Sequence, residues 1–152
     1  MNVKKYPAGI DCVWLAFDCE GRVGAFITAG LGPIPNSTFD ENLVSIEEVE
    51  SILDDLPPIT QAKLLVNVKR PDDFIALAER GFFVYDWTDI SRTSASAMNA
   101  YEPVAAPIKP IHLSELPRAL MIFAQASSFP ISFLVGEKLD AHKYFNCLEG
   151  QN

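Results

Sequence analysis

The chain has 152 residues, of which 49% are apolar and 21% charged, and 20 acids against 12 bases give it a net charge of -8. A chain of this length buries roughly 68–70% of its surface on folding, which predicts one globular domain over residues 1–152. The apolar content excludes a disordered chain. The acidic balance, without a basic run, argues against nucleic acid or an anionic membrane surface as a partner, because Lys and Arg provide both kinds of binding.

The negative charge is concentrated in the first third of the chain. Residues 1–55 contain ten acids and three bases, a net charge of -7, whereas the remaining residues carry -1. A functional account therefore has to explain why the acids gather there.

Neither the cysteines nor the N-terminus indicates a secreted or membrane protein. Cys12, Cys19 and Cys147 are odd in number and lack C-x-x-C spacing, so neither a disulfide framework nor a zinc site is expected. Residues 1–7 have two lysines but no apolar stretch typical of a signal peptide, and no window approaches the ~20 apolar residues of a membrane span. We expect a cytoplasmic protein with reduced cysteines.

The first predicted elements are a β-hairpin, a loop and a helix. Residues 12–17 and 22–28 are rich in aromatic and β-branched side chains, and Gly21 suits the turn between them. Gly24 marks a bulge or a close approach of another segment. Residues 29–38 read as an irregular loop, and Ser45-Ile-Glu-Glu48 has the form of a capping box that opens an amphipathic helix ending before Pro57.

The rest of the chain predicts two more helices and up to four strands. Residues 60–68 suit a weak strand or a helix, and 71–80 predict a helix that Gly81 ends. A strand over 82–87, a polar loop over 88–100 and a proline-punctuated edge strand over 101–113 follow. Residues 114–126 predict a helix and 131–135 a last strand. The order β-β-α-(β)-α-β-β-α-β indicates an α+β fold with a mixed, mainly antiparallel sheet and about three helices packed on it, covering one face.

Residue types that carry catalysis or bind cofactors are sparse. His112 and His142 are the only histidines and lack metal-ligand spacing, and the glycines at 24, 30 and 32 lack the following lysine of a phosphate loop. We therefore predict no metal, no cofactor and no enzymatic activity. An enzyme that uses Cys147 or Cys12 with His112 or His142 stays as an alternative, because such pairs meet in space rather than in sequence.

The candidate binding site is the acidic face of the first predicted helix with the loop before it. Acids at a helix C-terminus oppose the helix dipole, so stability alone does not explain the end of this helix. The candidate partner-binding residues are Asp40, Glu41, Glu47, Glu48, Glu50, Asp54 and Asp55.

Two stretches carry a resemblance to a known group of proteins. The first comprises Trp14–Asp18, Gly21, Gly24–Phe26, Ala29–Gly30 and Gly32–Pro35, and the second is Phe74–Trp87. Together they cover about half of the chain and resemble small acidic bacterial immunity proteins encoded beside contact-dependent or secreted toxins. The resemblance implies a cognate toxin as the partner, and it carries no catalytic residue over to this chain.

Two non-enzymatic functions follow as hypotheses. The first is an immunity protein whose acidic surface binds and neutralises a toxin with a basic surface. The second is a small-molecule-binding or regulatory domain in which Trp14, Phe26, Tyr85 and Trp87 line a pocket, although aromatic residues on strands more often form a core. The oligomeric state is left open.

Overall fold

A five-stranded mixed sheet forms the centre of the computed structural model, which describes residues 5–87 and 100–149. The strands β2 and β5 are parallel, and the other neighbours are antiparallel. In spatial order the strands are β1 (Val13–Phe17), β2 (Val23–Ile27), β5 (Phe83–Trp87), β6 (Tyr101–Pro107) and β4 (Ala62–Leu64). A separate two-stranded sheet pairs β3 (Ile34–Pro35) with β7 (Cys147–Leu148). The predicted α+β class with a mainly antiparallel sheet is confirmed.

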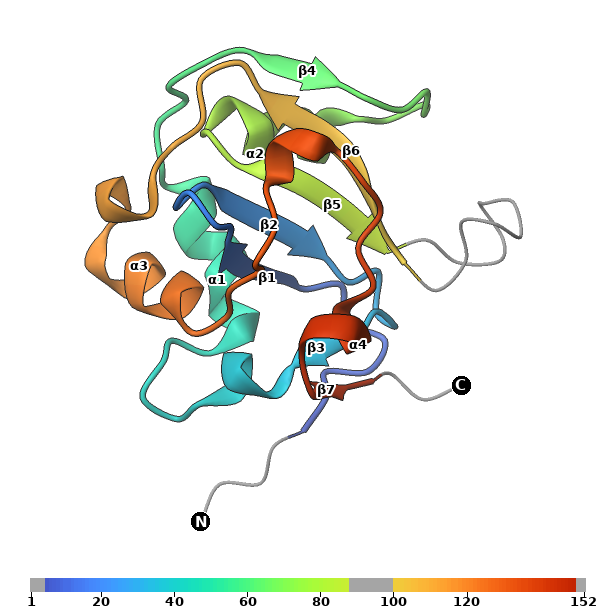
Figure 1. Cartoon of the computed structure of the whole chain (residues 1–152), viewed down its shortest axis with the longest axis vertical. Coiled ribbons are helices and arrows are strands. Elements are labelled where there is room, and N and C mark those ends of the chain that lie inside the picture. Colours follow the sequence, from blue (N-terminus) through green and yellow to red (C-terminus); the bar gives the residue numbers. More distant parts are fainter. Residues whose placement is uncertain (1–4, 88–99, 150–152) are drawn as a thin grey trace.

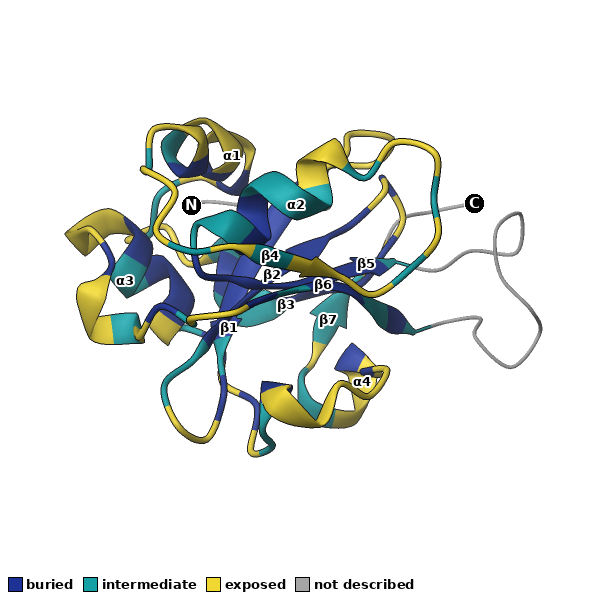
Figure 2. Cartoon of the chain, turned by 90° about the horizontal axis from the view of Figure 1, so that it is seen from above, coloured by how far each residue is buried: buried dark blue, intermediate teal, exposed yellow. Residues whose placement is uncertain are grey.

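The helices and the C-terminal segment cover the two faces of this sheet. The described residues form the α-helices α1 (Ile46–Asp54), α2 (Asp72–Glu79), α3 (Arg118–Gln125) and α4 (Ala141–Tyr144). Helices α1 and α2 lie on one face, and α4 with the segment before it lies on the other (Figures 1 and 2). Helix α3 packs beside the edge strand β1. The prediction that helices cover one face thus describes α1 and α2 but not α4.

The face under the C-terminal segment carries a stacked aromatic core. Trp14 stacks on Phe26 with ring centroids 4.2 Å apart, and Phe26 stacks on Tyr85 at 4.8 Å. The hydroxyl of Tyr101 accepts a hydrogen bond from Trp14 Nε1 at 3.0 Å and donates one to the carbonyl of Pro33 at 2.9 Å. These rings are buried, and the polar groups of Trp14 and Tyr101 are paired, which fixes the strand packing on this face.

Gly24 has the role that its place in a strand predicted. A Cβ added there would come within 3.0 Å of the ring of Phe133, so the glycine lets the C-terminal segment lie against β2. The hairpin, the helix at 46–54, the helix before Gly81 and the strand after it are likewise confirmed. Gly81 has a φ of 99°, the left-handed conformation expected after α2.

The predicted last strand over residues 131–135 is wrong. Phe133–Val135 form a 3₁₀ turn that ends at Gly136. The buried carboxylate of Asp18 accepts the N–H of Phe133 at 2.9 Å, and the Phe133 ring packs over Gly24. The side chains of Leu134 and Val135 are 61% and 62% exposed. Phe133 is therefore the buried residue of this 3₁₀ turn, and the apolar run does not form a strand of the sheet.

The prediction of an edge strand over 101–113 is also wrong, because β6 lies between β5 and β4. Val104 accepts from Leu65 N–H and Ile108 donates to Gln61, so the alternating Pro103 and Pro107 direct their missing N–H away from β4. Pro103 lies at an irregularity in the pairing of β6 with β5. The strand thus accommodates its prolines without losing bonds to its outer neighbour.

The smaller predictions have mixed outcomes. Ser45 is the N-cap of α1, but no side-chain hydrogen bond of a capping box forms. The loop predicted over 29–38 contains β3 and a 3₁₀ turn over Asn36–Phe39, while the alternation over 60–68 gives the short strand β4. The loop predicted over 88–100 lies outside the described residues except for Ala100. Within the described ranges, no helix is long and apolar enough to cross a membrane.

Candidate functional site

The seven predicted partner-binding residues are all exposed, but they do not form one surface. At 100° per residue, Glu50 and Asp54 lie one turn apart on one flank of α1, and Glu48 and Asp55 lie about 100–160° further round the helix. Asp40 has a local role as well, since its Oδ1 accepts the N–H of Asn42 at 2.8 Å. The acidic face is therefore divided into two flanks.

A cleft of about 420 Å³ lies between α1, α2 and the sheet, and the flank of α1 that carries Glu50 and Asp54 lines it. Glu50 and Asp54 contribute carboxylates from α1, and three acids outside the prediction join them. The added carboxylates are those of Asp11, Asp73 and Asp86. We refer to these five residues with their cavity as the acidic cleft.

Burial and mutual repulsion disfavour the ionised form of two carboxylates in the acidic cleft. Partial burial raises the pKa of Glu50, and the charges of Asp54, Asp11 and Asp73 raise it further. Burial also raises the pKa of Asp11, against the hydrogen bond that its Oδ1 accepts from Ala29 N–H. Carboxylates that disfavour each other's ionisation in this way gain free energy when a cation comes between them.

Arg70 and Arg80 line the same cleft. Arg80 offsets the unfavourable effect of the acids at the C-terminal end of α1. Its guanidinium donates to the carbonyls of Leu56, Ala76 and Asp54 at 2.8, 2.8 and 3.3 Å. The cation therefore occupies the C-terminal ends of α1 and α2, where it offsets the dipole that Asp54 and Asp55 oppose. The ion pairs between described residues join Arg22 to Asp18 and His142 to Glu149, and neither involves a carboxylate of α1.

The sheet topology places at the cleft the three acids that the sequence patterns missed. Asp11 precedes β1, and Asp86 is the second-last residue of β5. These strand ends meet at one edge because β2 runs antiparallel to β1 and parallel to β5. Asp73 lies at the start of α2, which the Gly81 turn folds back over β5. The helix-Gly-strand pattern was the available signal for Asp73. The strand pairing that brings Asp11 and Asp86 to the same edge of the sheet has no local signature.

The cysteines and histidines occupy separate environments with structural contacts. Burial raises the pKa of Cys12 to about 11 and that of Cys147 to about 12, which disfavours the thiolate that a nucleophile needs. His112 caps a 3₁₀ turn through Ser114, and His142 bonds Glu149. Across residues 5–87 and 100–149, no group of His, Cys, Asp and Glu has the arrangement of a metal site.

The aromatic side chains proposed to line a pocket belong mainly to the core. Trp14 and Phe26 have no exposed surface, and Trp87 packs against Tyr101 with ring centroids 5.2 Å apart. Only Tyr85, in the set of four, lines a described cavity. This filled core counts against a pocket lined by these four aromatic residues.

Comparison with protein-family models, with curated proteins and with solved structures found no significant match.

Replacing Glu50 by glutamine is expected to stabilise the protein at pH 7 by about 0.5 kcal/mol, because a carboxylate with a raised pKa is penalised in the folded state. The wild-type fold regains this stability as the pH falls through the raised pKa, so the difference disappears near pH 4. Thermal unfolding at both pH values measures it. Glu48→Gln on the other flank is the control and should stay close to wild type; an equal gain there would contradict the acidic cleft.

Proposed function

We propose that the chain is a non-enzymatic immunity protein that binds and neutralises a cognate bacterial toxin, with the acidic cleft as the contact surface. The observation that carries the proposal is the convergence of five carboxylates on one cleft at the end of the sheet. The resemblance of the hairpin and of Phe74–Trp87 to small acidic immunity proteins supports the same function.

The charge distribution supports a basic protein partner. A toxin that cleaves nucleic acid is basic where it binds phosphates, and a concentrated acidic surface speeds its encounter and occupies its cleft. Burial is the main cause of the raised pKa of Glu50 and of Asp11, and repulsion from neighbouring carboxylates adds to it; a Lys or Arg entering the cleft would relieve that repulsion.

Co-expression with the toxin encoded in the neighbouring gene tests the function. We expect a one-to-one complex that survives size-exclusion chromatography, loses affinity as salt rises, and protects cells that express the toxin. A toxin from an unrelated system is the control for specificity. Failure to protect cells and to form the complex, with both proteins folded, would contradict the proposal.

A further inference from the structure

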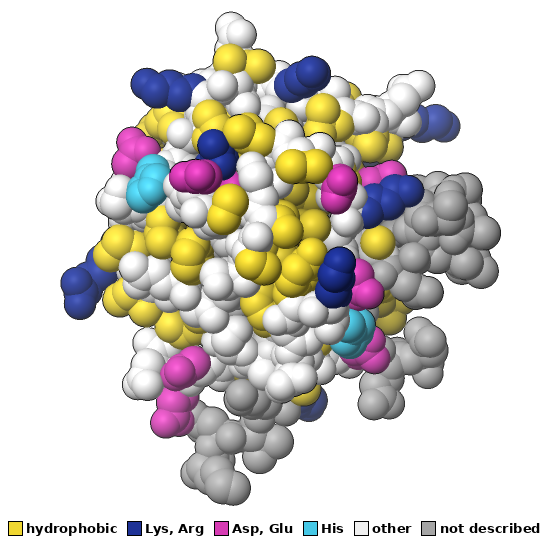
Figure 3. Space-filling model, in the orientation of Figure 1, with side chains coloured by type: hydrophobic (Ala, Val, Ile, Leu, Met, Phe, Trp, Pro, Cys, Tyr) yellow, Lys and Arg dark blue, Asp and Glu magenta, His cyan; other side chains and the backbone are white. Residues whose placement is uncertain are grey.

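A second cleft, of about 370 Å³, lies on the face of the sheet opposite α1 and α2. It opens between the 3₁₀ turn at Phe133–Val135 and α4, where hydrophobic side chains gather in the middle of the face in Figure 3. Its volume is within the range of small-molecule sites. The lining residues that matter below are Tyr85, Ile131, Glu137, Leu139, Lys143 and Tyr144.

The floor of this cleft is a buried tyrosine whose hydroxyl has no protein partner. Tyr85 is 1% exposed, and its ring stacks on Phe26 and packs against Phe133 at 5.6 Å. Its hydroxyl makes no hydrogen bond with any described residue and reaches the surface of the cleft, whereas the buried hydroxyl of Tyr101 makes two hydrogen bonds. Because this hydroxyl of Tyr85 lines the cleft, it is available to a molecule bound there. Burial raises the pKa of Tyr85, which keeps the hydroxyl protonated at neutral pH.

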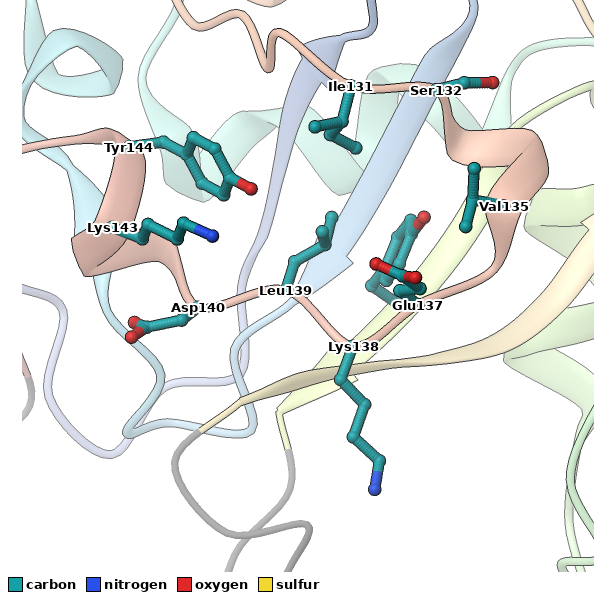
Figure 4. A pocket seen from close by; sticks show the side chains of 10 residues that line it. Ile131, Ser132, Val135, Glu137, Lys138, Leu139, Asp140, Lys143 and Tyr144 are labelled. Atoms are coloured by element: carbon teal, nitrogen blue, oxygen red, sulfur yellow. The ribbon is translucent and has the colours of Figure 1, made fainter.

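The walls present one positive and one negative charge across the cleft. Figure 4 shows Lys143 and Glu137 reaching into the space from opposite sides, with the hydroxyl of Tyr144 beside Lys143, while Lys138 and Asp140 point away. Neither Lys143 nor Glu137 belongs to an ion pair between described residues. Ile131 and Leu139 lie between them, so the charges are separated by an apolar surface.

We propose that this cleft binds a small zwitterion of the amino-acid class with an apolar side chain. The carboxylate of the ligand pairs with Lys143 and the Tyr144 hydroxyl, and its ammonium pairs with Glu137. Its side chain covers Ile131 and Leu139, and the Tyr85 hydroxyl bonds the polar head. The site lies on the opposite face from the acidic cleft, so it does not depend on the proposed toxin contact.

Titration of the ¹⁵N-labelled full chain with L-leucine, followed by NMR, tests the proposal. We expect saturable shifts centred on residues 131–144 with a Kd of about 0.1–1 mM, a range that suits a ligand of this size. N-acetyl-L-leucine and L-leucinamide, which each lack one charge, should bind about tenfold more weakly. Tyr85→Phe, Glu137→Gln and Lys143→Gln should each weaken L-leucine binding about tenfold.

The two buried tyrosines provide the control for folding. Because the Tyr85 hydroxyl has no protein partner, Tyr85→Phe should leave the Tm within about 2 °C of wild type. Tyr101→Phe removes two buried hydrogen bonds and should lower the Tm by about 4–8 °C. Absence of saturable shifts with L-leucine would overturn the proposal. Equal binding of L-leucine and its two analogues, or unchanged binding by the Glu137 and Lys143 variants, would overturn it as well.

Discussion

Replacing Asp18 by alanine is expected to destabilise the protein by about 3–5 kcal/mol, a large part of the total stability of a domain this size. Its side-chain carboxylate is fully buried and joins the hairpin loop to the C-terminal segment. Oδ1 accepts the N–H groups of Glu20 and Arg22 at 2.9 Å each, and Oδ2 accepts the N–H of Phe133 and the guanidinium of Arg22.

The expected loss combines broken hydrogen bonds to backbone N–H groups with a lost ion pair, and a control variant separates the two. Alanine leaves the buried N–H of Phe133 without a partner and removes the bond that holds the 3₁₀ turn over Gly24. Arg22→Met removes the partly exposed ion pair and the 3.5 Å contact of Arg22 Nη1 with Ser132 Oγ, and it should cost about 1 kcal/mol. Urea unfolding of both variants gives the two free energies, and a cost below about 1 kcal/mol for Asp18→Ala would contradict the role assigned to this carboxylate.

Reversing the two cleft charges of α1 has the largest expected effect on function. The double variant Glu50→Lys/Asp54→Lys should weaken toxin binding about 100-fold, because two favourable charge contacts become repulsive. The slope of affinity against salt should also decrease, since fewer charge pairs form.

The same variant is expected to fold normally. Lysine at the end of α1 suits the helix dipole, and loss of the Glu50 carboxylate removes repulsion from Asp11 and Asp73. The neutral variant Glu50→Gln/Asp54→Asn, which introduces no new cation near Arg80, should show an intermediate loss of affinity. Full affinity in both variants would exclude the acidic cleft as the contact surface.

The sequence predicted the elements that have strong local signals. The hairpin around Gly21 and the helix-Gly-strand unit around Gly81 are encoded by neighbouring residues, and both formed as predicted. The apolar run at 131–135 failed because its fate depends on Asp18 and Gly24, which are more than 100 positions away. Periodicity does not show that a run is held by one distant carboxylate.

Only part of the acidic cleft could be predicted from the sequence, because the rest depends on long-range strand pairing. Glu50 and Asp54 share one helix, so their spacing places them together, and both line the cleft. Asp86 joins them only because β5 pairs in parallel with β2, and Asp11 because β1 starts at the same end of the sheet. Long-range pairing of this kind completes a site whose helical half is visible in the sequence.

The measurement that tests the central claim most directly compares two double variants of the same helix. Each reverses one glutamate and one aspartate of α1, so their net charges are identical: Glu50→Lys/Asp54→Lys on the cleft flank and Glu48→Lys/Asp55→Lys on the other flank. Toxin affinity is measured by calorimetry for both at one salt concentration. We predict that the cleft variant binds at least about tenfold more weakly than its counterpart, because only the cleft acids surround an entering basic side chain. Equal affinities would show that net charge alone attracts the partner and would contradict a contact centred on the acidic cleft.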